Sequence, residues 1–239
     1  MQQTPIINRF SKGIHDGVPI ALGYLSVSFT FGMMAVSMGL PVWAAVLISM
    51  TNLTSAGQFA GLSLIVYGAP LAEMALTQLV INLRYALMSL SLSQKLHRSV
   101  NLADRLILSF GNTDEIFAVA SSQAGEIGKR YLYGLIFTPY LGWSAGTLLG
   151  AIAGTLLPAI VSSALGIAIY AMFLAIIIPP AKKHRAVLLV VLLAIGLSCI
   201  FRWVPLFSGL SSGFAIILCT LVAAIAGAIF HPIREEEDS

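Results

Sequence analysis

Arg84 lies in the middle of an apolar stretch, Leu71 to Leu92, that is long enough to cross a lipid bilayer as a helix. A guanidinium stays protonated at any working pH, and placing it at membrane depth costs roughly 2.5–3.5 kcal/mol on insertion scales. A chain that keeps this charge is expected to use it, either to hold a partner that defines the fold or to meet an anionic group in transit. The residue therefore constrains both what must cover it and what it can bind.

The composition indicates a membrane protein. Of the 239 residues, 58% are hydrophobic and only 10% are charged, against about 25% charged in a typical soluble domain. The apolar runs are continuous, unlike the alternating segments of about ten residues that build a membrane β-barrel. We therefore predict an all-α, polytopic membrane helical bundle, with residues 1–239 forming a single membrane domain surrounded by lipid.

Charge and motifs exclude several other classes of protein. The net charge of +3 is too small to indicate a nucleic-acid partner. Cys199 and Cys219 lie in apolar runs without metal-site spacing, so we expect inert thiols and no metal. Gly209–Gly213 matches G-x-S-x-G, but it lies in a loop between two membrane helices and not at a strand-to-helix turn. We expect no cofactor and no enzymatic activity.

Six apolar segments are long enough to cross the bilayer, and two more are interrupted by polar residues. The uninterrupted segments are 17–38, 70–92, 131–157, 160–181, 186–204 and 208–230. Segment 41–68 contains Thr51–Gln58, and segment 106–122 contains Gly111–Glu115. Irregular backbone at membrane depth is tolerated only where protein or water covers it.

The basic residues predict how these segments cross the membrane. If all eight crossed fully, the basic loop 93–105 would lie outside, against the positive-inside rule. If 41–68 enters and returns on the outside, and 106–122 does so on the inside, every basic cluster is cytoplasmic. Both termini are then cytoplasmic, namely the N-terminal segment 1–16 and the acidic tail 231–239. The alternative in which 41–68 is one long tilted helix stays open.

The two interruptions enter from opposite faces in this topology, as in transporters built from inverted repeats. Asn52 to Ala60 also weakly resembles Asn112 to Ala118, which is consistent with such a repeat. In the first interruption, Gly57 allows the backbone to unwind, and Asn52, Ser55 and Gln58 can satisfy freed backbone groups or a polar ligand. A simple polar kink is the alternative.

Polar residues of segment 70–92 gather on one broad face, opposite a face rich in leucine. The two polar stripes are Glu73, Thr77, Arg84 and Ser91, and Gln78, Asn82, Tyr85 and Ser89. We expect Asn82, Arg84 and Tyr85 to contact a solute or, alternatively, to hold a structural salt bridge.

Asp114 and Glu115 are the natural partners of Arg84, because an unpaired charge in a low dielectric is strongly disfavoured. One acid can neutralise Arg84, and the other can then titrate as a proton-coupling group. Alternatively, both acids lie in a loop and face water.

Glycines recur every four residues at Gly142, Gly146, Gly150 and Gly154. This spacing makes a flat helix face on which a second helix can pack closely. The sequence predicts either an intramolecular seam or a docking site for a partner subunit.

Four motifs carry a family resemblance in their order and spacing. They are Gly17-x-Pro19, Ala56-Gly57-Gln58-Phe59, Asn82-x-Arg84-Tyr85 and Thr113-Asp114-Glu115-x-Phe117-Ala118. Together, from about Phe10 to Pro180, they resemble the AzlC family, the large subunit of branched-chain amino acid exporters. The resemblance implies a multi-pass protein of the bacterial inner membrane that exports branched-chain and related neutral amino acids. It also implies a small membrane subunit of the AzlD type as a partner.

The residues are compatible with an amino-acid cargo. A zwitterion needs a cation or a helix N-terminus for its carboxylate, and an acid or carbonyl groups for its ammonium. We expect Arg84 or a broken-helix N-terminus to meet the carboxylate, and Asp114 or Glu115 to meet the ammonium or a coupling proton. The sequence contains no ATP-binding motif, so we expect coupling to the proton gradient. Two alternatives stay open: a non-transporting membrane scaffold subunit, and a passive channel for small zwitterionic solutes.

Overall fold

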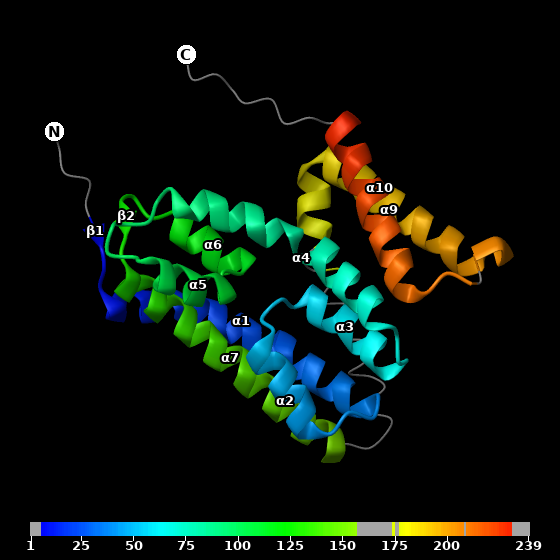
Figure 1. Cartoon of the computed structure of the whole chain (residues 1–239), viewed down its shortest axis with the longest axis horizontal. Coiled ribbons are helices and arrows are strands. Elements are labelled where there is room, and N and C mark those ends of the chain that lie inside the picture. The colour runs from blue at the N-terminus through cyan, green and yellow to red at the C-terminus, as the bar shows by residue number, and fades with distance from the viewer. Residues whose placement is uncertain (1–5, 157–173, 175–176, 208, 231–239) are drawn as a thin grey trace. The chain divides into compact units, whose positions relative to one another are not determined.

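The computed structural model describes residues 6–156, 174, 177–207 and 209–230, and these are helical almost throughout (Figure 1). The prediction of an all-α membrane fold is confirmed. The helices are α1 (Phe10–Ser37), α2 (Val42–Thr51), α3 (Ala56–Val66), α4 (Leu71–Ser93), α5 (Leu102–Phe110), α6 (Asp114–Ser121), α7 (Lys129–Leu156), α9 (Arg185–Trp203) and α10 (Ser212–Phe230). The short elements are the strands β1 (Ile6–Ile7) and β2 (Glu126–Ile127) and a 3₁₀ turn, Pro205–Phe207.

Five of the described helices are long and apolar enough to cross a membrane. They are α1, α4, α7, α9 and the Gly213–Phe230 part of α10, and they match five of the six predicted crossings. The remaining predicted crossing, 160–181, lies almost entirely outside the described residues. The tail 231–239 also lies outside them, as does the start of the 1–16 segment.

The chain divides into two compact units. The first comprises Met1–Leu62 and Asn82–Ile169, and the second comprises Ser63–Ile81 and Tyr170–Ser239. Helix α4 contributes its N-terminal half to the second unit and its C-terminal half to the first.

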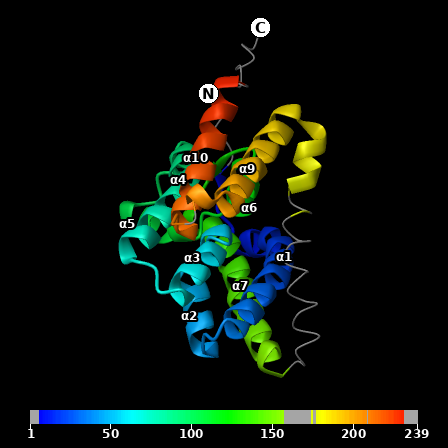
Figure 2. The same cartoon turned by 90° about the vertical axis from the view of Figure 1, so that its right-hand side faces the viewer.

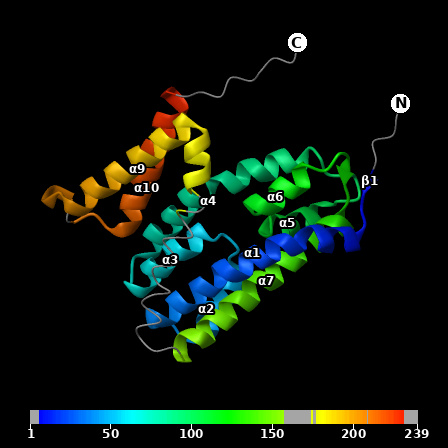
Figure 3. The same ribbon diagram turned by 180° about the vertical axis from the view of Figure 1, so that it is seen from behind.

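The first unit is built around α1 and α7, which lie side by side and run in the same direction (Figures 1 and 3). A side chain at Gly146 or Gly150 would overlap the backbone of α1 at Leu25 or Phe29. In the same way, a side chain at Gly13 would overlap the backbone of α7 at Tyr131. Glycines of both helices therefore allow the backbones to approach closely, as in membrane helix pairs with small residues at the interface.

The starts of α1 and α7 lie at the same end of the first unit, which we call the basic end. Strands β1 and β2 pair in parallel there, and the 93–101 loop joins them through hydrogen bonds between Lys95, His97 and Ile127. Three basic clusters therefore lie together: Arg9 with Lys12, Lys95 with Arg98 and Arg105, and Lys129 with Arg130. The topology prediction placed these clusters on one side. That this side is the cytoplasm stays a prediction.

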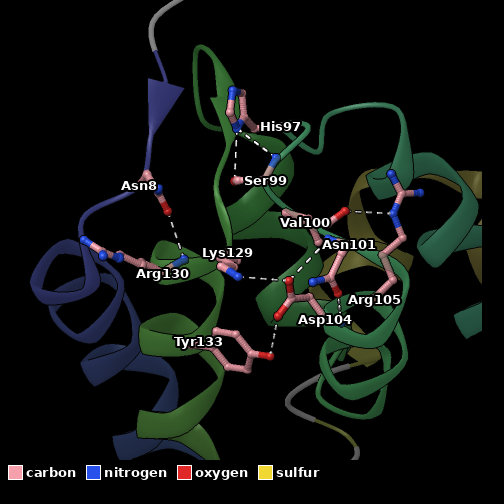
Figure 4. Close-up of polar contacts among 10 residues, drawn as sticks. All are labelled: Asn8, His97, Ser99, Val100, Asn101, Asp104, Arg105, Lys129, Arg130 and Tyr133. Carbon is pink, nitrogen blue, oxygen red and sulfur yellow. Dashed lines mark hydrogen bonds and ion pairs between the residues drawn. The ribbon is translucent and has the colours of Figure 1, made fainter.

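The second broken segment, α5 and α6, begins and ends at the basic end. Asp104, in the first turn of α5, binds Lys129 and Tyr133 of α7 at 3.3 Å and 3.0 Å (Figure 4). At the other end of the segment, Lys95 donates a hydrogen bond to the backbone carbonyl of Ser121 at the end of α6. The segment therefore enters the unit and returns to the same end, as predicted for 106–122.

The first broken segment, α2 and α3, starts at the opposite end of the unit. Helix α2 follows the C-terminus of α1 after a short turn at Met38–Leu40. Helix α3 then turns back toward the end at which α2 starts, because Phe59 of α3 packs edge-on against Phe31 in the C-terminal part of α1. The chain leaves the helical conformation between Thr51 and Ala56, so the alternative of a single tilted helix over 41–68 is wrong.

In the second unit, α9 and α10 pack side by side (Figure 2), and α10 is capped by a residue of another helix. Glu73, in the first turn of α4, accepts hydrogen bonds from Ser211 Oγ at 2.5 Å and from the backbone N–H of Gly213 at 3.0 Å. A carboxylate at a helix N-terminus is favoured by the exposed N–H groups and the helix dipole. The loops that precede α4 and α10 therefore lie at the same end of this unit.

Candidate functional site

The two helix breaks meet inside the first unit. The residues between α2 and α3 and those between α5 and α6 line a common cavity of about 230 Å³. Its lining comprises Thr51–Thr54, Tyr85, Ser109, Phe110, Asn112 and Thr113. Non-helical backbone thus lies where protein surrounds it, as a bilayer requires.

The local sequence explains both breaks. Ser55 has a φ of +49°, a left-handed conformation that is uncommon for residues other than glycine. Asn52 is extended, and its side chain accepts a hydrogen bond from Thr54 Oγ1 at 2.6 Å. Such local side-chain bonds compete with helix formation. In the second break, Gly111 ends α5, and Thr113 is extended before α6 begins.

Arg84 and Asp114 form an ion pair at this meeting point. Arg84 Nη1 lies 2.9 Å from Asp114 Oδ2, and the two side chains are 47% and 43% exposed. The pair is therefore made, and both side chains stay partly exposed. Asp114 lies in the first turn of α6, where the helix N-terminus also favours a negative charge.

Glu115 has a separate partner, the buried Tyr24 of α1. The Tyr24 hydroxyl lies 2.5 Å from both Glu115 Oε2 and Thr113 Oγ1. A phenol carries one proton and an ionised carboxylate can only accept, so Tyr24 donates to Glu115 and accepts from Thr113. Tyr24 thereby ties the start of α6 to the middle of α1.

Gln58 is held by a buried hydrogen-bond chain and lies apart from the ion pair. Its Nε2 donates to Ser49 Oγ at 2.5 Å, and its Oε1 accepts from Trp143 Nε1 at 3.0 Å. Ser49 in turn lies 2.6 Å from Thr147 Oγ1. These contacts join α2 and α3 to α7, so the structure gives Gln58 a role in holding the break.

The other predicted site residues fall into two groups. Tyr85 lies at the cavity, where its hydroxyl donates to the Thr54 carbonyl at 3.4 Å and accepts from Arg84 Nη2 at 3.3 Å. Asn52 lines the same cavity. Ser55 shapes the backbone of the first break. The prediction that the backbone unwinds at Gly57 is wrong, because Gly57 lies within helix α3 and the break falls just before it. Asn82 lies on α4 two residues before Arg84. Contact of these residues with a solute stays a prediction.

Sequence reasoning missed several residues of this region. Tyr24 and Trp143 provide buried polar contacts, and Asp104 fixes the second broken segment. Tyr24 and Trp143 lie in long apolar runs, where nothing local marks a polar role. Sequence reasoning also left out Arg202, which lies in the last turn of α9.

The arrangement is suited to binding a solute that carries both charges. It presents a guanidinium, two carboxylates, hydroxyl groups and helix termini at one place. Among the described residues, no group of three potential metal-binding side chains occurs.

Paired broken helices that meet within a helical bundle are typical of polytopic membrane transporters, in which such helices form the solute site. Comparison with known proteins gives the family. A family model described as AzlC protein matches residues 19–157, and this chain belongs to the AzlC family.

The names of three relatives support a membrane location. An "uncharacterized membrane protein" of Archaeoglobus fulgidus is 34% identical over 74% of this chain and 78% of its own length. "Inner membrane protein YgaZ" of Escherichia coli is 27% identical over 98% of this chain and 97% of its own length. An "uncharacterized membrane protein" of Helicobacter pylori is 30% identical over 61% of this chain and 66% of its own length. No solved structure matches the chain.

Proposed function

We propose that this protein is a secondary transporter that exports branched-chain and related neutral amino acids across the bacterial inner membrane. In this proposal it is the large subunit of a two-component permease and works with a small membrane subunit of the AzlD type. Membership of the AzlC family supports the cargo class. The observation that carries the proposal is the Arg84–Asp114 ion pair where the two helix breaks meet.

An ion pair is the natural counterpart of a zwitterion. The carboxylate of an amino acid can replace Asp114 on Arg84, while its ammonium takes the place of Arg84 on Asp114. The exchange leaves no uncompensated charge in a low dielectric, where an unpaired charge is strongly disfavoured. The first turn of α6 and the carbonyl groups at the end of α5 add poles of both signs.

Proton coupling is assigned to Glu115 in this proposal. Its side chain has Tyr24 as its hydrogen-bond partner and is not the one that neutralises Arg84. It can therefore gain or lose a proton without breaking the ion pair that receives the solute.

Efflux from cells loaded with a leucine-containing dipeptide tests the proposal. The host lacks its own exporters and expresses this chain with and without a small AzlD-type subunit. We expect leucine and valine efflux with the pair, and loss of at least about tenfold in Arg84→Ala and in Glu115→Gln, which corresponds to about 1.4 kcal/mol. Arg98→Ala, which removes an exposed arginine at the basic end, is the matched control and should export normally.

The same assay separates the alternatives. Normal export by both Arg84→Ala and Glu115→Gln contradicts the proposed site. Export that simply follows the leucine gradient after the proton gradient is collapsed indicates a passive channel. Recovery of activity when the charges of Arg84 and Asp114 are exchanged indicates a scaffold in which the pair serves assembly alone.

A further inference from the structure

The first unit contains a second, larger cavity that the proposed function does not use. It has a volume of about 390 Å³ and lies among the C-terminal half of α4, α5, α6 and α7, and we call it the hairpin cavity. Its walls are mainly apolar, including Leu92, Leu108, Ile116, Leu132 and Ile136. The volume falls in the lower part of the range for sites that bind small molecules.

The hairpin cavity also contains a buried polar atom without a partner. Asn112 is 5% exposed and lines the cavity. Its Nδ2 donates to Ser89 Oγ at 3.0 Å, but its Oδ1 has no hydrogen-bond partner among the described residues. Buried acceptors are almost always satisfied, so this atom indicates a site for a donor that a ligand supplies.

The hairpin cavity adjoins the site at the helix breaks. Ser109 and Asn112 line both the hairpin cavity and the 230 Å³ cavity beside Tyr85. Asn112 is only two residues from Asp114, which binds Arg84. An occupant with its charged groups at the ion pair can therefore extend an apolar group past Asn112 into the hairpin cavity.

We propose that the hairpin cavity is the side-chain pocket of the transport site. In this arrangement the apolar walls receive the side chain of the amino acid, Asn112 Oδ1 accepts a hydrogen bond from its ammonium, and the cavity limits side-chain size. The inference rests on the proposed function and adds the residues that set specificity. The competing occupant is a lipid acyl chain, but the unpartnered Asn112 oxygen and the serine hydroxyls favour a ligand with polar hydrogens.

Competition between amino acids of different size tests the pocket. The measured quantity is the ratio of leucine efflux to alanine efflux, normalised to the amount of folded protein. Ser109→Leu narrows the junction of the two cavities and removes only a local bond to the Leu106 carbonyl, so we expect this ratio to fall by about tenfold. Ser26→Leu is the matched control, because Ser26 also bonds the carbonyl three residues before it on an exposed helix face; its ratio should not change.

Two further variants separate the apolar and polar roles. Ile136→Ala widens the cavity and should raise phenylalanine efflux relative to leucine efflux. Asn112→Leu removes the acceptor and should raise the half-saturating concentration for leucine and alanine alike, with their ratio unchanged. Thermal unfolding of each purified variant confirms that the protein is folded.

The outcomes are distinct. Absence of amino-acid efflux from the unaltered protein refutes the proposed function, and the pocket with it. If the unaltered protein exports leucine but Ser109→Leu and Ile136→Ala keep its selectivity, the proposed function stands and the pocket is refuted. Mass spectrometry that finds a phospholipid retained by the unaltered protein and lost in Ser109→Leu, with selectivity unchanged, assigns the cavity to lipid and also refutes the pocket.

Discussion

At the scale of single residues, the charges of the site are divided between two partners. Asp114 neutralises Arg84, and Glu115 binds the hydroxyl of Tyr24. This division leaves Asp114 paired with the cation and Glu115 with a neutral hydrogen-bond partner. Each acid therefore has a structural contact whose loss can be measured apart from transport.

Replacing Tyr24 by phenylalanine should destabilise the start of α6. The ring packs edge-on against Trp143 at 5.2 Å, and phenylalanine keeps that contact while it loses the bonds to Glu115 and Thr113. We expect a loss of about 1 kcal/mol, which lowers the midpoint of thermal unfolding by about 2–4 °C. Tyr67→Phe is the control, since Tyr67 is 78% exposed. Equal unfolding midpoints for the two variants would mean that the Tyr24 hydroxyl does not stabilise the start of α6.

At the scale of elements, Asp104 fixes the second broken segment to α7 (Figure 4). Burial alone would raise the pKa of Asp104, but hydrogen bonds from Tyr133, the Asn101 backbone and Lys129, with the charge of Lys129, hold it below its ordinary value of 3.8. A carboxyl group with a lowered pKa in the folded state stabilises the fold above its unfolded pKa. That contribution is lost as the pH falls through the folded-state pKa.

The unfolding midpoint of Asp104→Asn should therefore depend on pH differently from that of the unaltered protein. We expect the variant to be less stable at neutral pH. The difference should shrink as the pH falls below the unfolded-state pKa of about 4 toward the lower pKa of Asp104 in the folded state. Thermal unfolding between pH 3 and pH 7 measures this. Glu126→Gln, at the same end of the unit, is the control and should run parallel to the unaltered protein. A difference that is constant over the whole pH range would contradict the role of the ionised carboxylate.

The packing of α1 on α7 gives a second prediction at this scale. A methyl group at Gly150 would overlap the Phe29 carbonyl, so Gly150→Ala should destabilise the protein by about 1–3 kcal/mol. Gly23→Ala on α1 has nothing within 4 Å of the added carbon and should be neutral or slightly stabilising. The readout is the unfolding midpoint in detergent. If both variants have the same unfolding midpoint, the close approach of the α1 and α7 backbones does not limit the stability of the protein.

The elements differ in how far the sequence predicts them. Both breaks follow from local chemistry, because Asn52, Ser55 and Gly111 stand among short polar residues within otherwise apolar runs. The glycine face from Gly142 to Gly154 is equally local, but its partner α1 is set by contacts more than a hundred residues apart. For the same reason, the roles of Tyr24 and Asp104 could not be predicted. The pairing of Arg84 with an acid could be predicted, because a cation within an apolar membrane segment needs a counter-charge.

At the scale of the whole molecule, the positions of the basic clusters constrain membrane topology. Arg9, Lys95, Lys129 and their neighbours lie at one end of the first unit, and short loops rich in lysine and arginine face the cytoplasm. The second broken segment starts and ends at this end, and α2 starts at the other. We therefore predict that the basic end of the first unit is cytoplasmic and the opposite end external, which cysteine labelling can test.

Single cysteines at Ser99 and Ser63, in a chain whose Cys199 and Cys219 are replaced by serine, should react from opposite sides. Ser99 lies in the loop at the basic end and Ser63 in α3. An impermeant maleimide applied to intact cells should label the Ser63 position first, and Ser99 only after the membrane is opened. Cysteines at Ser11 and Ser37, near the two ends of α1, calibrate the two sides. Labelling of Ser63 and Ser99 from the same face would contradict opposite entry of the broken segments, and the external entry of α2 and α3 would have to be abandoned.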